Sequence, residues 1–189
     1  LKVSGAVQAA RWTKLADGTG FIHSFNGPHS LFVDTIRSCR VLAVAHQLGH
    51  VLMGEQDAKI SLLKRVIQHA MNTSLYNVYF GDQRDVYDVR GRTAHEAVFN
   101  TASGEFRCPN SQQGYSPFST WTRGLAWAIC GFAEQLEFLR TLTDEQIEIE
   151  VLFNGSKPAK DLAKLWKRLS RSATAAAMIT RSAAGADVA

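Results

Sequence analysis

The protein has 189 residues, 46% of them apolar, and a formal net charge of +4. A chain of this length and apolar content is expected to fold as one globular domain, which excludes an intrinsically disordered protein. The sequence contains no run of about 18 consecutive apolar residues and opens without the basic and then apolar pattern of a signal peptide, so it indicates neither a membrane span nor export.

The cysteines and the distribution of charge further limit the classes of protein that fit this sequence. Cys39, Cys108 and Cys130 are odd in number, far apart and in none of the spacings typical of zinc sites. We therefore expect a reduced, cytoplasmic protein without a metal or a cofactor. Residues from Val151 onward carry seven Lys or Arg and two Asp, a net charge of +5, which leaves −1 for the rest of the chain. Because the basic run at residues 160–171 fits a solvated helix face, nucleic-acid binding is not indicated.

The first half of the chain is predicted to be mainly helical. A short helix is expected over Val3–Leu15, and the apolar residues that share one of its faces are Val3, Val7 and Ala10. After a loop, apolar residues at helical spacing predict a long, largely buried helix over Leu31–Leu52. The same spacing predicts an amphipathic helix over Asp57–Tyr76.

The second half alternates loops with helices. From Tyr76 to Asn100 the apolar period shortens towards two, which predicts a small β-hairpin or an extended loop. An aperiodic loop follows, and Ser119 or Thr120 is expected to be the N-cap of a helix from Trp121 to about Thr141. Further helices are expected over Thr143–Val151 and Lys160–Arg181, with a break at residues 154–158.

These elements predict an all-α fold in a single domain spanning residues 1–189, with the hairpin or extended loop as an insertion. The connecting loops are too long for a four-helix bundle. Long helices that follow one another with such loops favour a helical toroid or a solenoid, although no internal repeat is evident.

Two polar residues sit in surroundings that suit chemistry. Asp34 follows an apolar run at the start of a predicted helix, and burial of a carboxyl group raises its pKa into the range useful for proton donation. The alternative is that Asp34 only caps its helix. His95 lies within the extended segment, where an imidazole either binds hydroxyl groups or satisfies a turn.

The densest group of candidate binding residues surrounds the helix that starts near Trp121. On this helix Arg123 and Trp127 are four residues apart and share a face, which offers a guanidinium for a carboxylate and an indole for stacking on a sugar ring. The preceding loop is rich in amides and hydroxyls. The alternative is that the tryptophans only pack in the core.

A pair of histidines invites a metal-site interpretation. His46 and His50 share a helical face as in zinc proteases, but Gln47 stands where the catalytic Glu of such enzymes would be. Without that base the position lacks the general base of a metalloprotease, so no metal site is predicted.

Taken together, these stretches resemble glycoside hydrolase family 88, the unsaturated glucuronyl hydrolases, from about Val7 to Leu136. The motifs that carry the resemblance are the run from Gly20 to Asp34, His95 followed by Gly104-Glu105-Phe106, and Gln113-Gly114-Tyr115-Ser116 followed by Trp121-Thr122-Arg123-Gly124-Leu125-Ala126-Trp127. The resemblance implies an (α/α)6 barrel that removes a 4,5-unsaturated uronic acid from the non-reducing end of a glycosaminoglycan or similar oligosaccharide. It implies hydration of a vinyl ether rather than direct displacement at the anomeric carbon.

The resemblance also implies roles for particular residues. Asp34 occupies the place of the general acid and base that protonates C4 and helps deliver water to C5. Residues implied to line the substrate pocket are Arg123, Trp127, Trp121, Gln113, His95 and Ser111. Three features depart from the family: the second aspartate is missing, Ile36-Arg37-Ser38-Cys39 replaces a segment that carries an Asn, and family chains are about twice as long. A domain lacking N-terminal helices and part of the C-terminal helices is therefore expected.

Two other functions remain open at this point. A non-catalytic helical carbohydrate-binding protein or scaffold fits the short length and the missing aspartate. An unsaturated rhamnogalacturonyl hydrolase shares the fold and the chemistry but takes another aglycone. The sequence predicts an oligosaccharide partner rather than a nucleic acid or a membrane, and it leaves the oligomeric state open.

Overall fold

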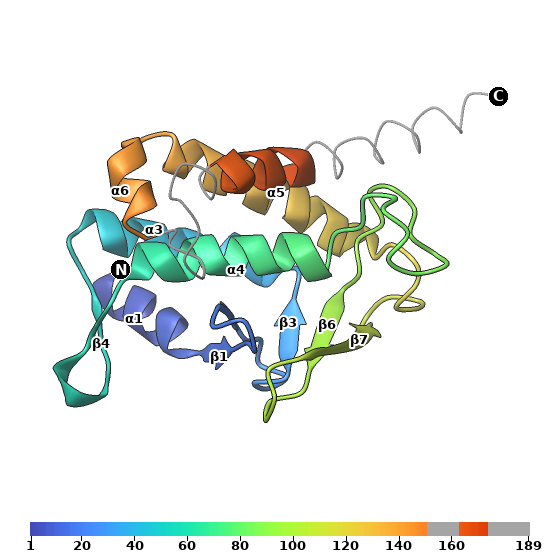
Figure 1. Ribbon diagram of the computed structural model, residues 1–189, viewed down its shortest axis with the longest axis horizontal. Helices are drawn as coiled ribbons and strands as arrows, with labels where there is room; N and C mark the ends of the chain where they lie inside the picture. The colour runs from blue at the N-terminus through green and yellow to red at the C-terminus, as the bar shows by residue number, and fades with distance from the viewer. Residues whose placement is uncertain (151–162, 174–189) are drawn as a thin grey trace.

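The computed structural model describes residues 1–150 and 163–173, and over these residues the fold mixes helices and strands rather than being all-α as predicted (Figure 1). The helices are α1 Lys2–Ala10, α2 Thr35–Ser38, α3 Arg40–Gln47, α4 Leu62–Tyr76, α5 Thr122–Leu139 and α6 Asp144–Glu148, with a further helical segment over residues 163–173 and a 3-10 turn, η1, at Glu55–Asp57. The strands are β1 Trp12–Lys14, β2 Gly20–Ile22, β3 Ser30–Phe32, β4 Leu52–Met53, β5 Lys59–Ile60, β6 Glu96–Phe99 and β7 Phe106–Asn110. No described helix is long and apolar enough to cross a bilayer.

Helix α4 is the centre of the fold, with α5 on one side and α1 on the other (Figure 1). Its Leu63 and Ile67 pack in a core shared with α2, α5 and residues 163–173, whereas Leu62 and Val66 pack in a second core with α1 and α3. Ser61 caps the helix by accepting a hydrogen bond from the Lys64 amide, which is the reason that α4 starts later than the Asp57 predicted.

Buried polar residues on α4 form hydrogen bonds with the backbone of strand β2. The His69 Nδ1 atom accepts a hydrogen bond from the Ile22 amide at 3.1 Å, and the Asn72 amide donates to the Gly20 carbonyl at 2.8 Å. Burial lowers the pKa of His69 to about 3, so this imidazole is neutral at physiological pH. These bonds fix β2 against the helix.

Helix α1 forms where a helix was expected, but the buried face was predicted wrongly. Gly5 and Ala9 are buried, whereas Val3 and Val7 are 76% and 61% exposed. A Cβ atom at Gly5 would lie only 2.5 Å from the Ala45 Cβ, so the small residues allow α1 to approach α3 closely. The larger apolar residues of α1 therefore point away from the described fold.

The helix predicted over Leu31–Leu52 is replaced by a strand, two short helices and a second strand. Residues 30–32 form β3, which pairs antiparallel with β6, and helical structure begins only at Thr35 and breaks at Cys39. The pairing partner of Leu31 is Ala97, which is distant in sequence, so local periodicity did not reveal it. β6 also pairs with β7, giving the sheet order β3-β6-β7. Within residues 76–100, where a small hairpin or an extended loop was predicted, Val78 and Thr93 form an antiparallel bridge at the base of a long loop, and a longer hairpin lies between β6 and β7.

The last helices follow the prediction more closely. α5 covers nearly all of the predicted Trp121–Thr141 helix, but its N-cap is Trp121, without a side-chain capping bond, rather than Ser119 or Thr120. α6 has a complete capping box between Thr143 and Gln146. The break predicted at residues 154–158 and the remainder of the Lys160–Arg181 helix lie outside the described residues.

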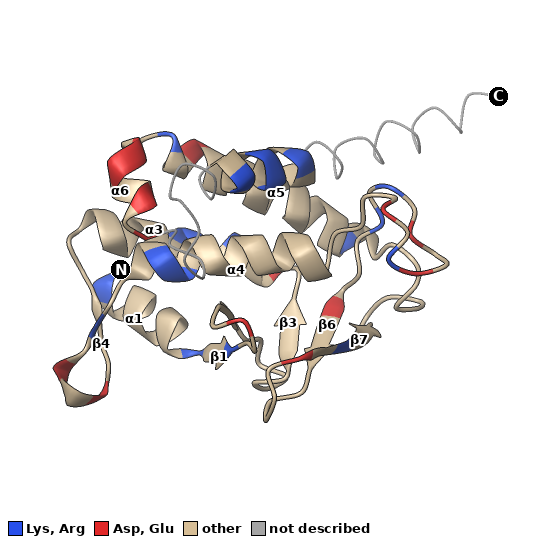
Figure 2. Ribbon diagram, viewed as in Figure 1, with Lys and Arg blue, Asp and Glu red and all other residues tan. Residues whose placement is uncertain are grey.

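The basic run was interpreted as a solvated helix face, and half of that interpretation holds (Figure 2). Lys164 and Lys167 are exposed. Arg168 instead donates to the Ser74 hydroxyl at 3.1 Å, and Arg171 pairs with Asp82 at 2.8 Å. The two arginines therefore attach residues 163–173 to the end of α4 and the loop that follows it.

Candidate active site

Asp34 lies between β3 and α2, where the chain leaves the sheet. The Val33 amide donates to the His95 carbonyl at 3.0 Å, which extends the β3–β6 pairing as far as the residue before Asp34. Asp34 is the N-cap residue of α2, yet its side chain makes no capping hydrogen bond. Its Oδ1 atom is buried and has no hydrogen-bond partner among the described residues. Asp34 therefore occupies the N-cap position without making the side-chain hydrogen bond of a cap.

The surroundings of Asp34 favour its protonated form. Burial raises the pKa of this carboxyl, while the backbone amides of Asp34 and Thr35 and the charge of Arg123 oppose the rise without cancelling it. Asp34 opens into a cavity of about 340 Å³ lined also by Trp127, Arg37, Ser38 and Arg40. A half-buried acid at the wall of an open cavity is able to exchange a proton with a bound molecule.

Two arginines that were not predicted as site residues line this cavity. Arg37 and Arg40 both approach Glu134 of α5, at 3.3 and 3.5 Å, so each keeps one fixed anionic partner. With Arg123 they place three cations around Asp34, which suits an anionic ligand. The signal in the sequence was Arg37 three residues after Asp34, a spacing at which helical neighbours meet, whereas Arg40 lies beyond the break at Cys39.

The start of α5 brings the predicted arginine and both tryptophans together. The Arg123 guanidinium lies 4.8 Å from the ring centre of Trp121 and 5.6 Å from that of Trp127. Gly124 makes this possible, since a Cβ there would lie 2.3 Å from Trp121 Cε3 and 2.8 Å from Val33 Cγ1. The indole of Trp121 therefore folds over the first turn of α5 and against the residue that precedes Asp34.

A continuous row of aromatic rings links the sheet to α5. Ring centres are 5.5 Å apart for Phe25 and Phe32, 4.5 Å for Phe32 and His95, 4.0 Å for His95 and Trp121, and 5.7 Å for Trp121 and Trp127. Contacts of this kind fix the orientation of each ring. The row leads to the cavity at Asp34, because Trp127 lines it.

His95 is buried, and its two nitrogens differ. Its Nδ1 atom accepts hydrogen bonds from the Gln112 and Gln113 amides at 3.1 and 3.3 Å, so the ring proton must sit on Nε2. The Nε2 atom is buried and lacks a partner within residues 1–150 and 163–173. Burial lowers the pKa of His95. The negative charge of Glu96 raises this pKa, and the positive charge of Arg123 lowers it. A neutral imidazole with a free donor results.

The loop that follows β7 connects His95 to Arg123. The Ser111 hydroxyl accepts a hydrogen bond from the Gly114 amide at 2.8 Å, which closes a tight turn around Gln113. The Gln113 side-chain carbonyl in turn accepts a hydrogen bond from Arg123. The structure thus gathers Gln113, His95, Trp121, Trp127 and Arg123 beside Asp34, while Ser111 is engaged in shaping the turn.

Glu96 is the residue of this region that sequence reasoning missed. Its side chain is fully buried, and four side chains donate to its carboxylate: Ser30 at 2.5 Å, Asn26 at 3.0 Å, Asn110 at 2.7 Å and Gln112 at 2.9 Å. Burial raises the pKa of Glu96, but these donors outweigh it and leave the pKa below its ordinary value. The carboxylate thereby ties the loop before β3 to the loop after β7.

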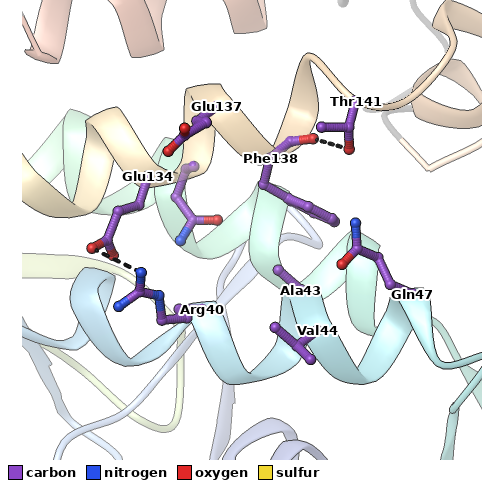
Figure 3. A pocket seen from close by; sticks show the side chains of 9 residues that line it. Arg40, Ala43, Val44, Gln47, Glu134, Glu137, Phe138 and Thr141 are labelled. Atoms are coloured by element: carbon purple, nitrogen blue, oxygen red, sulfur yellow. Dashed lines mark hydrogen bonds and ion pairs between the residues drawn. The ribbon is translucent and has the colours of Figure 1, made fainter.

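A second hollow of about 230 Å³ opens between α3 and α5, on the far side of Arg40 (Figure 3). Its floor is apolar, with Ala43, Val44 and Phe138, and Glu134 and Glu137 stand along its edge. None of the predicted site residues lines it.

Helix α5 is held against α2 at the site by close packing of Gly131 against Ile36. A Cβ atom at Gly131 would lie 2.5 Å from the Ile36 Cγ2 atom.

The histidines of the considered metal motif do not gather further ligands. Within the described part of the chain, no cluster of three or more His, Cys, Asp or Glu side chains has the geometry to hold a metal ion. His46 belongs to α3 and His50 follows that helix, so both come well after Asp34 in the sequence.

Comparison with known proteins identifies relatives by structure only. No family model matches the chain, and no curated protein sequence matches it. The unsaturated glucuronyl hydrolase from Bacillus sp. GL1, responsible for the degradation of glycosaminoglycan, superposes with a TM-score of 0.54 over 90% of this chain, at 20% identity. This chain has the fold of part of that enzyme. A structure of UGL with asparagine in place of an aspartate, together with dGlcA-Glc-Rha-Glc, gives the same TM-score, identity and coverage.

The shared fold covers only part of these structures. This chain spans 37% of the length of either one. The likeness agrees with the resemblance seen in the sequence motifs and extends over most of the chain, and it establishes a common fold.

Proposed function

We propose that this chain carries the catalytic residues of a hydrolase that removes a 4,5-unsaturated uronic acid from the non-reducing end of glycosaminoglycan-type oligosaccharides. The observation that carries the proposal is the state of Asp34. Its carboxyl has a raised pKa and a buried oxygen without a partner among the described residues, and it stands at the wall of a cavity beside an indole and a guanidinium.

In the proposed reaction protonated Asp34 transfers its proton to C4 of the vinyl ether, which leaves an oxocarbenium ion with its positive charge shared between C5 and the ring oxygen. The Asp34 carboxylate then takes a proton from water as the water oxygen bonds to C5, so Asp34 is protonated again at the end. The product is a hemiketal, which opens and expels the aglycone as an alcohol. No net charge or proton is consumed by the protein.

The single carboxylate suits this chemistry better than ordinary glycoside hydrolysis. Of the described residues that line the cavity, Asp34 alone carries a carboxylate. Direct displacement at an anomeric carbon uses two carboxyl groups on opposite sides of the bond. Hydration of a double bond needs one group that first gives and then takes a proton.

The other residues are proposed to bind the uronic acid. Arg123 is positioned for the substrate carboxylate, with Gln113 holding its guanidinium in place. Trp127 offers a ring face within the cavity, and Trp121 supports both residues. The Nε2–H group of His95 is available to a hydroxyl group. Ser111 is proposed to act through the turn that carries Gln113.

We also propose that the described helices form part of an (α/α)6 toroid. The exposed apolar face of α1, with Val3 at 76% and Val7 at 61%, is of the kind that a neighbouring helix covers in such a fold. The structures of the same fold are longer than this chain, which spans 37% of each.

The test is an absorbance assay on the full polypeptide that carries these residues, with an unsaturated uronyl disaccharide and the matching saturated one. The proposal expects loss of the C4=C5 absorbance and release of the aglycone from the unsaturated disaccharide, with the saturated one unchanged. Turnover restricted to substrates with a rhamnose aglycone would identify a rhamnogalacturonyl hydrolase instead. Saturable binding of both disaccharides without turnover would identify a carbohydrate-binding protein.

A further inference from the structure

Three aromatic side chains face solvent beside the candidate site without being buried by the described fold. Tyr115 is 100% exposed, Tyr87 is 52% exposed and Phe118 is 43% exposed. We call these three residues the aromatic rim. They come from two loops, residues 81–92 and residues 111–121, whose contact is shown by the Tyr87 and Phe118 rings, 4.9 Å apart.

The loop of Tyr87 is held rigidly although its tip is exposed. The Asp88 carboxylate accepts hydrogen bonds from the Gly81 amide at 2.9 Å and the Arg84 amide at 2.8 Å. The Asp85 carboxylate accepts from the Tyr87 amide at 2.8 Å and pairs with buried Arg92 at 2.6 Å. Two carboxylates therefore define the backbone that presents Tyr87.

The loop of Tyr115 and Phe118 is ordered in a similar way. The Ser116 hydroxyl accepts a hydrogen bond from the Phe118 amide at 3.0 Å, and the Ser119 hydroxyl donates to the Ser116 carbonyl at 3.0 Å. The Trp121 amide donates to the Thr93 carbonyl at 3.2 Å, which joins this loop to the residues that follow the Tyr87 loop. These hydrogen bonds order the loop backbone from which the rim residues project, while the Tyr115 ring itself stands free of the described fold.

The rim adjoins the groups proposed to bind the uronic acid. Tyr115 follows Gln113 by two residues, and Gln113 is bonded to Arg123. Phe118 precedes Trp121 by three residues, and the two share the loop that enters α5. The rim therefore lies on the loop that carries Gln113 and leads to Trp121, and on the loop that contacts it through Tyr87.

The exposure of these rings separates them from the aromatic residues that pack the fold. Phe106, which is 39% exposed, stacks on Tyr76 at 5.1 Å and contacts Phe99. The Tyr115 side chain, in contrast, is fully exposed. Tyrosine offers an apolar ring face and a polar hydroxyl, which match the apolar face and the hydroxyl edge of a pyranose ring.

We infer that the aromatic rim binds the aglycone, as a stacking platform for the sugars that follow the unsaturated uronic acid. This inference rests on the proposed function of the Asp34 cavity and adds a preference for substrates longer than a disaccharide. Tyr115 is the main platform, and the Tyr87–Phe118 pair extends it. The rim determines specificity and takes no part in the proton transfers.

The test compares an unsaturated disaccharide with the corresponding unsaturated tetrasaccharide on the full polypeptide. Tyr115→Ser and Tyr87→Ser are expected to lower kcat/KM for the tetrasaccharide by about five- to tenfold and for the disaccharide by less than about twofold. Tyr115→Phe keeps the ring and is expected to retain the tetrasaccharide rate. Glu105→Gln, at an exposed residue on the loop between β6 and β7, is a control expected to change neither value of kcat/KM.

Several outcomes would overturn the inference. Equal losses on both substrates, or no loss on either, would mean that the rim does not contact the aglycone. A fall in Tm for Tyr115→Ser of more than about 4 °C would mean that the ring packs against protein. If the unmodified protein hydrolyses neither substrate, the proposed reaction fails. The rim is then judged by tryptophan fluorescence, where tetrasaccharide binding that is weakened by Tyr115→Ser and kept by Tyr115→Phe supports it, and absent or unchanged binding refutes it.

Discussion

Glu96 lies on β6 and Asp34 follows β3, the strand paired with it, yet the surroundings of the two acids are opposite. Glu96 pairs in register with Phe32, two residues before Asp34. The Glu96 carboxylate has four side-chain donors, whereas the Oδ1 atom of Asp34 has no partner among the described residues. Although burial disfavours the charge on both, the pKa of Glu96 lies below its ordinary value and that of Asp34 lies above it.

Burial raises the pKa of both acids, and only Glu96 has enough hydrogen-bond donors to outweigh that effect and remain charged. A carboxylate with all its lone pairs engaged is fixed in place and is poorly suited to exchanging protons. An acid with an unpartnered oxygen at the wall of a cavity retains that capacity. We therefore assign Glu96 to holding the loops and Asp34 to the chemistry, and the predictions below test this division.

The largest effect is expected from Asp34→Asn. The amide has nearly the same shape but neither gives nor takes a proton at C4 or C5, so turnover should fall by about a thousandfold. Loss of absorbance from an unsaturated disaccharide measures it. Residual activity above about a tenth of the original would place the proton donor elsewhere.

The next effect is on stability and is expected from Glu96→Gln. In the variant an amide nitrogen, which is a donor, would replace one carboxylate oxygen and face the donors that this oxygen now accepts from. We therefore expect the free energy of unfolding at neutral pH to fall by about 2–3 kcal/mol. Urea denaturation at two pH values measures this. Because the folded pKa of Glu96 is lowered, its contribution is present above the unfolded pKa and is lost as pH falls through the folded value. The deficit of the variant should therefore shrink in acid.

A matched control separates the two roles. Glu105→Gln changes an exposed acid on the loop between β6 and β7 and should leave stability within about 0.5 kcal/mol of the original. If Glu96→Gln also proved this mild, the four-donor carboxylate would not be the link between the two loops.

Local sequence patterns predicted the helices whose buried face is formed by residues on successive turns of the same helix. α4, α5 and α6 fall within the predicted ranges. The Gln113 and Arg123 side chains that the motifs after β7 singled out are hydrogen-bonded to each other at the start of α5. Apolar spacing failed for α1, because it favoured Val3 and Val7, whereas close contact with α3 required the small residues Gly5 and Ala9.

Long-range pairing explains the other failures. β3 is a strand because β6 pairs with it, and nothing within residues 31–52 signals that partner. Thr120 suits an N-cap, but its hydroxyl accepts a hydrogen bond from the Thr93 amide at 3.4 Å instead. Glu96 was overlooked for the same reason, since its donors come from two distant parts of the chain, residues 26–30 and 110–112.

The pH dependence of turnover offers a third test. Since protonated Asp34 starts the reaction, kcat/KM should fall about tenfold per pH unit above its pKa. The positive charge of Arg123 lowers that pKa, so Arg123→Gln should move the descending limb to higher pH, in addition to weakening binding. Glu105→Gln, at an exposed acid on the loop between β6 and β7, is the control and should leave the limb in place. An unmoved limb in Arg123→Gln would show that another group controls it.

The smallest effect is a gain in stability from the same Asp34→Asn variant. The folded pKa of Asp34 lies above its unfolded value, so the folded protein binds more protons there and loses stability as pH rises between the two values. Asparagine removes this penalty, so above that window the variant should unfold at a Tm higher by about 2–4 °C, equivalent to about 1 kcal/mol. Below both pKa values the difference should vanish. Scanning calorimetry at neutral and acid pH distinguishes this from Glu96→Gln, whose effect has the opposite sign at neutral pH. A destabilised Asp34→Asn protein would mean that the carboxylate serves the fold and that the two acids do not differ in role.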